Sequence, residues 1–155
     1  MGHKRTIGLW IIIVIEILFL VFLLLGQTMS FINYDFTVSL GLQESKEIVG
    51  EMGVAVNKGF GVGDTIIYAP FLILGIVGLL LKRMWGIFAM VGALAITAYW
   101  PIVVIFLLLF AKGTPGFHFT SFTSYSIGLT LIVLYSLWGL WYLYAHRRRL
   151  INSEL

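Results

Sequence analysis

The sequence predicts an all-α integral membrane protein with four transmembrane helices, both termini on the cytoplasmic side, and an amphipathic outer helix in the first loop. Composition is the first reason, because 60% of the 155 residues are hydrophobic and only 11% are charged, far outside the range of soluble domains. The second reason is that four apolar stretches are each long enough, at about 1.5 Å per helical residue, to cross most or all of a hydrocarbon core of about 30 Å. The third is the placement of the basic residues between these stretches.

The chain is predicted to be a single membrane domain of alternating helices and loops. The transmembrane helices are expected at residues 7–25, 65–81, 85–110 and 127–144, with outer loops at 26–64 and 111–126 and a basic inner tail at 145–155. Three basic clusters lie before, between and after these helices, at Lys4-Arg5, Lys82-Arg83 and Arg147 to Arg149. Because short basic loops stay in the cytoplasm, all three clusters are expected on that side.

Charge and cysteine content limit the function classes. The formal charge of +3 reflects the inner clusters, and a basic triplet directly after an apolar helix is typical of an anchor that touches anionic lipid. We therefore predict the lipid bilayer, and not nucleic acid, as a partner. The absence of cysteine excludes thiol nucleophiles and iron–sulfur ligation. The first apolar stretch is expected to be retained and not cleaved as a signal peptide, because Glu16 lies at its centre.

The first outer loop contains a helical pattern at about residues 43–58. On a helical wheel its apolar residues gather in one arc, whereas Glu44, Glu47 and Glu51 fall together outside it. An interfacial helix that binds anionic lipid would have a basic polar face. We therefore expect this acidic helix to lie across the outer mouth of the bundle.

Glycines and an aspartate follow this pattern. Gly59 and Gly61 are expected to end the loop helix, and Asp64 to cap the start of the second transmembrane helix. The preceding stretch, residues 27–41, is either extended or interfacial, and its pattern does not decide between the two.

The third predicted transmembrane helix contains most of the small residues. Ala89, Ala93 and Thr97 recur at four-residue spacing, which allows neighbouring backbones to approach closely. We expect this helix at the centre of the contacts, with its small-residue face available to a second copy or to another membrane protein. Pro101 leaves a carbonyl near Thr97 without its helical partner, a break that is tolerated where helices pack or a cavity opens.

Glu16 is the one ionisable residue that the prediction places in the bilayer core. A charge there is costly, so the carboxyl is expected to be neutral unless water or a cation reaches it. Its partner must come from another helix, and four polar residues of the third and fourth helices lie at similar depth: Thr97, Tyr99, Tyr135 and Ser136. Two interpretations remain open, a cross-helix hydrogen bond that fixes packing and a site that handles protons or cations.

Other candidates for chemistry have weaker support. His3 and His146 form the one histidine pair that could meet, and two ligands without a nearby carboxylate make a poor metal site. Glu44, Glu47 and Glu51 could bind a hard cation together with Asp35 or Asp64, but a solvated acidic face is the favoured interpretation. An aromatic stripe on the fourth helix suits packing or a hydrophobic ligand, and its members are Tyr135, Trp138 and Tyr142. No metal, cofactor or catalytic residue is predicted.

Three functions remain open. The favoured one is a non-enzymatic subunit, assembly factor or hydrophobic-ligand-binding protein of a membrane. The second is a small oligomeric carrier or channel that uses Glu16 for proton or cation coupling. The third, an enzyme that modifies lipid with Asp64, His118 or the loop acids, has the least support, because no nucleophile, base and orienting group occur at a known spacing.

Overall fold

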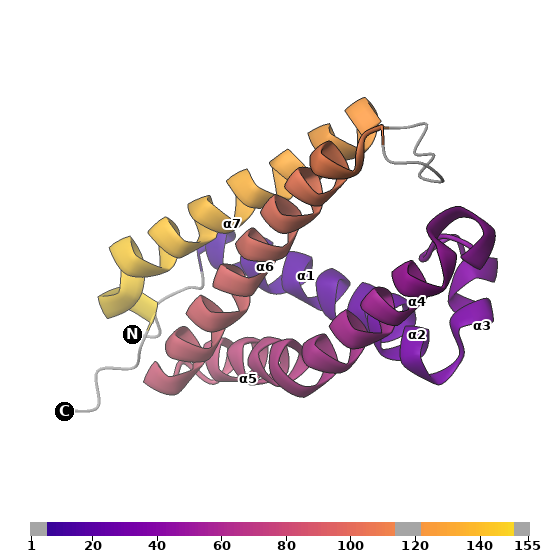
Figure 1. The fold of residues 1–155 in the computed structure, drawn as a ribbon. Helices are drawn as coiled ribbons and strands as arrows, with labels where there is room; N and C mark the ends of the chain where they lie inside the picture. The colour runs from indigo at the N-terminus through magenta and orange to yellow at the C-terminus, as the bar shows by residue number, and fades with distance from the viewer. Residues whose placement is uncertain (1–5, 114–121, 151–155) are drawn as a thin grey trace.

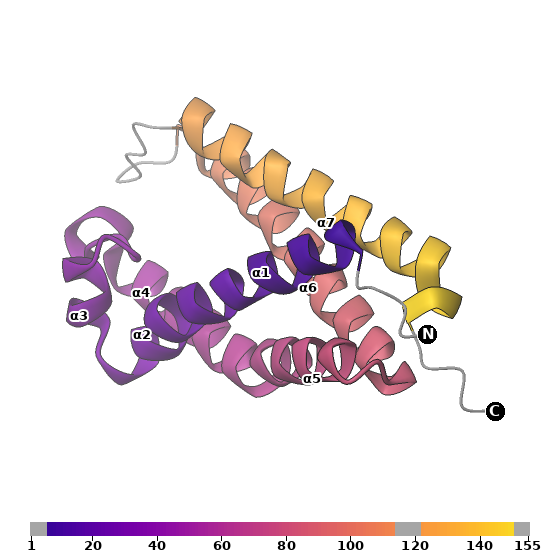
Figure 2. The same ribbon diagram turned by 180° about the vertical axis from the view of Figure 1, so that it is seen from behind.

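The structure, a computed structural model, describes residues 6–113 and 122–150, and every regular element in these ranges is helical. Four helical segments in the described ranges are long and apolar enough to cross a membrane: Ile7–Ile32, Lys46–Leu80, Met84–Ala111 and Phe122–Leu150. The predicted helical class and the presence of four such helices are therefore confirmed. Figures 1 and 2 show them as two helical hairpins, one of the first two segments and one of the last two, which meet near one end and diverge toward the other.

The first two long segments each contain a π-helical turn. α1 (Ile7–Phe22) continues through η1 (Leu23–Thr28) into α2 (Met29–Ile32). α4 (Lys46–Gly63) continues through η2 (Asp64–Tyr68) into α5 (Ala69–Leu80). Between them lies α3 (Tyr34–Ser39), which starts where the side chain of Asn33 accepts a hydrogen bond from the Phe36 amide at 3.2 Å. Residues 27–41, left open by the sequence pattern, are thus largely helical.

The expected break between the loop helix and the second transmembrane helix is absent. Asp64 has helical φ and ψ of −63° and −39° and lies inside a continuous helix, so its prediction as an N-cap was wrong. Gly61 does not end the helix either. A Cβ atom at Gly61 would lie 2.3 Å from the carbonyl oxygen of Gln27, so this glycine allows two helices to touch.

The acidic residues of the first loop do not share one separate amphipathic helix, as the helical wheel had predicted. Gly50 interrupts α4 with φ +68° and ψ 177°, a conformation essentially restricted to glycine, so residues on either side of it do not share one regular wheel. Glu44 precedes the helix. Glu51 forms an ion pair with Lys46, with 2.7 Å between Glu51 Oε1 and Lys46 Nζ. α4 packs beside η1 and α2 as an extension of α5.

α6 (Met84–Ala111) is central, as predicted, because it packs along both α5 and α7 (Phe122–Leu150). Ala89, Ala93 and Thr97 are buried against these neighbours. A Cβ atom at Gly86 would lie 2.3 Å from the carbonyl carbon of Gly78, so α5 and α6 make backbone contact. The small-residue face is used inside the chain, and any partner would have to contact another surface.

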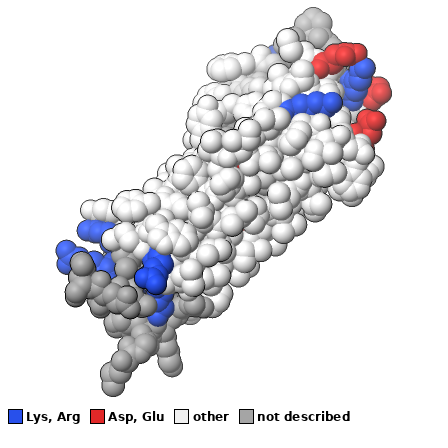
Figure 3. Space-filling model, turned by 90° about the horizontal axis from the view of Figure 1, so that it is seen from below, with Lys and Arg blue, Asp and Glu red and all other residues white. Residues whose placement is uncertain are grey.

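The charged side chains gather at opposite ends of the molecule. The basic end comprises the α5–α6 turn (Lys82, Arg83) and the last turn of α7 (Arg147 to Arg149), which lie together in Figures 1 and 2. The acidic end comprises α3 and the start of α4, with Asp35, Glu44, Glu47 and Glu51. Figure 3 shows basic side chains alone at one end and a mixture with acidic ones at the other. Lys4 and Arg5 lie outside the described residues.

Candidate functional site: a polar layer shared by four helices

Glu16 lies on the buried stripe of α1. Leu9, Ile12, Ile13 and Glu16 are the buried residues of this helix, and their spacing of three and four residues places them on one face. The remaining faces of α1 are apolar and largely exposed. Glu16 is 0% exposed, so its carboxyl group points into the bundle.

One oxygen of Glu16 is bonded to α7. The Tyr135 hydroxyl donates a hydrogen bond to Glu16 Oε1 at 3.0 Å, and the Tyr135 ring stacks on Phe19 with a centroid distance of 6.3 Å. The other oxygen, Oε2, is buried and has no hydrogen-bond partner among residues 6–113 and 122–150. The carboxyl group is thus held by a single cross-helix hydrogen bond, and one of its two oxygens is unpaired.

Tyr68 and Thr97 supply the other two helices of this polar layer. The Tyr68 hydroxyl and Thr97 Oγ1 form a short hydrogen bond, and Thr97 Oγ1 also donates to the carbonyl of Ala93 at 2.9 Å. Because the threonine proton is used on that carbonyl, the tyrosine is the donor in the shared bond. Tyr68 belongs to the buried core against which Tyr135 packs. The polar layer therefore comprises Glu16, Tyr68, Thr97 and Tyr135, one residue from each long helical segment.

Tyr68 was missed by the sequence analysis. It is 3% exposed and belongs to a buried face of the second long segment that continues at Leu72, Ile76 and Leu79. The spacing of four, four and three residues was the available signal. This signal was obscured because Asp64 was predicted to start a new helix, which placed Tyr68 in the first turn of that helix.

Two predicted members of the site do not join it. Tyr99 is 63% exposed, because two residues after Thr97 the helix has turned by about 200°. Ser136 is buried, but its hydroxyl donates to the carbonyl of Ile132 at 2.8 Å on its own helix. α6 also runs unbroken through Pro101, which is buried.

The predicted outer acidic residues do not form one site. Glu44, Glu47 and Glu51 are exposed, whereas Asp64 is half-buried in η2. Within the described ranges no three His, Asp or Glu side chains are close enough to hold a metal ion, so the hard-cation alternative gains no support. Tyr34 donates to the backbone carbonyl of Glu44 at 2.9 Å, which anchors the loop before α4.

The aromatic stripe of α7 packs against α1 and extends to the basic end. Its rings follow one another at centroid distances of 6.3, 5.4 and 4.3 Å, in the order Tyr135, Trp138, Tyr142 and His146. The Tyr142 hydroxyl bonds Thr6 Oγ1, and its ring occupies the space that a side chain at Gly8 would fill. These contacts favour a packing role over a ligand cradle. His3 and His118 lie outside the described residues.

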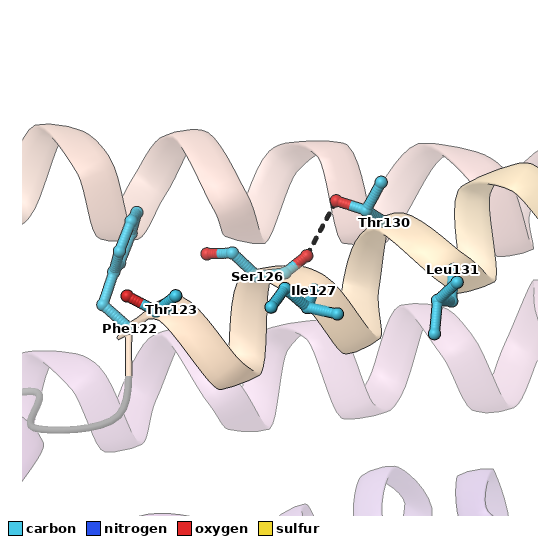
Figure 4. A pocket seen from close by; sticks show the side chains of 6 residues that line it. All are labelled: Phe122, Thr123, Ser126, Ile127, Thr130 and Leu131. Atoms are coloured by element: carbon cyan, nitrogen blue, oxygen red, sulfur yellow. Dashed lines mark hydrogen bonds between the residues drawn. The ribbon is translucent and has the colours of Figure 1, made fainter.

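A groove of about 320 Å³ lies on the first half of α7. Figure 4 shows its lining, with Thr130 bonded to the carbonyl of Ser126 at 2.7 Å, and the residues are Phe122, Thr123, Ser126, Ile127, Thr130 and Leu131. All six belong to one helix, and the groove is wide open. It lacks the convergent polar groups from several elements that define a specific ligand site.

The comparisons with known proteins are negative. No family model, curated protein or solved structure matches this chain. Its function must be inferred from the polar layer and from the distribution of charge.

Proposed function

We propose that the chain is an integral membrane protein whose basic end faces the cytoplasm. The two described basic groups, at the α5–α6 turn and in the last turn of α7, lie at the same end. A helix count of four is consistent with both termini on one side. Short basic segments resist translocation, which supports the cytoplasmic assignment of this end.

Within the membrane, the favoured function is non-enzymatic: a subunit, an assembly factor or a hydrophobic-ligand-binding protein. The observation that supports it is the closed polar layer, in which Glu16 and Thr97 are 0% exposed and each is bonded to a side chain of another helix. Hydrogen bonds of this kind determine how neighbouring helices pack, and the bonded groups are shielded from water. They suit a scaffold whose exposed apolar faces contact other molecules.

Native mass spectrometry of the purified protein tests this function. The protein should retain a partner, a second copy or bound lipid when it is released from mild detergent. Glu16→Gln should retain the same bound species, because its amide oxygen can still accept the bond from Tyr135. A strictly monomeric, empty particle under these conditions would contradict the proposal.

A second candidate is a small carrier or channel in which Glu16 couples to protons or cations. The specific observation in its favour is that Glu16 Oε2 is buried and has no hydrogen-bond partner in the described part of the chain. An unpaired buried oxygen is energetically costly, and ionisable residues inside membrane helices often mark proton or ion pathways. Flux measurements in proteoliposomes test this candidate: Glu16→Gln should abolish ion- or proton-coupled flux, and Glu51→Gln at the exposed acidic end should not. No flux, or flux that survives Glu16→Gln, would exclude it.

A further inference from the structure

Tyr99 is a polar residue on the exposed face of α6. Its side chain is 63% exposed, and its hydroxyl has no hydrogen-bond partner in the described part of the chain. Thr97, two residues earlier, is 0% exposed and belongs to the polar layer. Of these two polar side chains at nearly the same depth, the inward one is bonded within the chain and the outward one is not.

Tyr99 lies near the middle of its transmembrane segment. α6 runs from Met84 to Ala111, so at about 1.5 Å per residue Tyr99 is about 20 Å from either end of the helix. Tyrosine is common at the surfaces of a membrane, where its hydroxyl reaches water. From the centre of a hydrocarbon core about 30 Å thick, a tyrosine side chain does not reach either surface. A hydroxyl that is exposed to lipid without a hydrogen bond is costly, so this position indicates a protein partner.

Tyr99 belongs to a continuous strip along α6. The members of this strip recur at alternating spacings of four and three residues, a pattern that lets two helices interdigitate at a small crossing angle. The Tyr99 strip comprises Phe88, Gly92, Ala95, Tyr99, Ile102 and Phe106. A Cβ atom at Gly92 would lie 3.0 Å from the ring of Phe71 on α5, so this glycine is already in contact within the chain. Ala95 is exposed one turn before Tyr99, and a small residue there lets a second helix approach closely.

A second copy of the chain has the chemistry that this strip requires. All copies are inserted in a membrane with the same orientation, so a twofold axis along the membrane normal places equal residues of two α6 helices at equal depth. A tyrosine hydroxyl both donates and accepts hydrogen bonds, and Tyr99 of one copy is therefore a suitable partner for Tyr99 of the other. α6 contains no acidic or basic residue, so like charges do not oppose contact along the strip.

We propose that the chain forms a parallel twofold dimer in which the Tyr99 strips of two copies pack together and the two Tyr99 hydroxyls share a hydrogen bond. The inward face of α6, with Ala89, Ala93 and Thr97, packs within each copy, and the opposite face joins the copies. The proposal rests on the proposed function of a non-enzymatic membrane subunit, for which it names the partner and the surface.

Cysteine cross-linking in the membranes of cells that express the protein tests this contact, because the chain has no native cysteine. A disulfide needs Cα atoms about 4.4–6.8 Å apart, and close to a twofold axis a cysteine meets its own equivalent. Ala95→Cys should therefore give a disulfide-linked dimer on oxidation. The control is Leu18→Cys on α1, which is 53% exposed and lies at a similar distance from the start of its helix. It should remain monomeric.

Energy transfer between labelled copies in lipid vesicles measures the contribution of the hydroxyl. Tyr99→Phe should weaken dimerisation about five- to thirtyfold, the range for a hydrogen bond between transmembrane helices in model peptides. In a detergent that separates the copies, the same substitution should leave the stability of the single chain unchanged, because the hydroxyl has no partner within it. The matched control is Tyr144→Phe, a tyrosine of α7 that is 70% exposed. It should dimerise with the wild-type affinity.

Three results overturn the proposal: no cross-linking of Ala95→Cys, equal cross-linking of Ala95→Cys and Leu18→Cys, or wild-type affinity in Tyr99→Phe. Native mass spectrometry separates such a failure from failure of the proposed function. A foreign protein or bound lipid on a chain that does not dimerise excludes the dimer and leaves the subunit function standing. An empty monomer excludes both.

Discussion

At the scale of single residues, Glu16 is tolerated inside an apolar helix because one phenol reaches it from α7. Tyr135 donates to Oε1 at 3.0 Å, whereas Oε2 is left without a partner in the described part of the chain. A buried polar group that loses its last partner bears the full cost of desolvation. The stability of the polar layer therefore depends on the hydroxyl of Tyr135 more than on its ring.

Tyr135→Phe is expected to destabilise the protein by about 1–3 kcal/mol, because it removes the donor and leaves both carboxyl oxygens buried without a hydrogen bond. Equilibrium unfolding in a mixed-detergent titration measures this change. The matched control is Tyr99→Phe, whose hydroxyl is on the exposed face of α6 and whose loss should stay within about 0.5 kcal/mol. Equal effects of the two substitutions would show that the Tyr135–Glu16 bond contributes nothing.

Gly50→Ala is expected to destabilise α4 by about 1–3 kcal/mol, because φ +68° with ψ 177° is strained for any residue with a Cβ atom. Thermal unfolding followed by circular dichroism measures the loss. Gly59→Ala is the control, since Gly59 is helical and a Cβ atom there meets nothing within 4 Å. It should be neutral or stabilising by up to about 1 kcal/mol, and a loss like that of Gly50→Ala would contradict this account of the kink.

At the scale of elements, the two π-helical turns lie against each other. η1 and η2 are in contact, and Thr28 and Thr65 share a hydroxyl hydrogen bond of 2.7 Å across them. Pro70, in the first turn of α5, supplies no amide to the turn before it, which explains a change of hydrogen-bonding pattern at this point. Single π turns often occur at functional sites, and η2 is the element that positions both Asp64 and Tyr68.

Gly61→Ala should separate these elements, because its Cβ atom would lie 2.3 Å from the carbonyl oxygen of Gln27 and 2.6 Å from Ser30 Oγ. We expect a loss of about 1–3 kcal/mol in unfolding free energy, as for other overpacked contacts. Gly63→Ala, two residues later in open space, should be neutral or gain up to about 1 kcal/mol. If both variants unfold at the same denaturant concentration, the close contact of α4 with η1 is not formed.

At the scale of the whole molecule, charge is separated along the long axis. The described basic clusters share one end, whereas Asp35, Glu44, Glu47 and Glu51 lie at the other. Between them the exposed surface of the long helices is dominated by large apolar side chains, which suits a hydrocarbon environment. Because α6 packs along both α5 and α7, the orientation of one hairpin determines that of the other.

Labelling of single cysteines tests this orientation, and the absence of native cysteine leaves each introduced thiol as the one target. A membrane-impermeant maleimide should label Glu44→Cys in intact cells and Met84→Cys, beside the α5–α6 turn, after permeabilisation. This follows from the cytoplasmic preference of short basic segments. The reverse pattern would invert the proposed topology, and labelling of both in intact cells would contradict a fixed orientation.

Local patterns of hydropathy, charge and residue size were enough to predict the helical class, the four apolar segments and the central position of α6. The third helix was predicted at residues 85–110 and is found at Met84–Ala111, because hydropathy and flanking charge are local properties of the chain. The tertiary structure alone decided that Tyr68 joins the polar layer, that Tyr99 faces outward and that Gly61 is a point of contact. These outcomes depend on how far each helix is rotated about its axis, and that rotation is set by packing against the other helices and not by any property of a single segment.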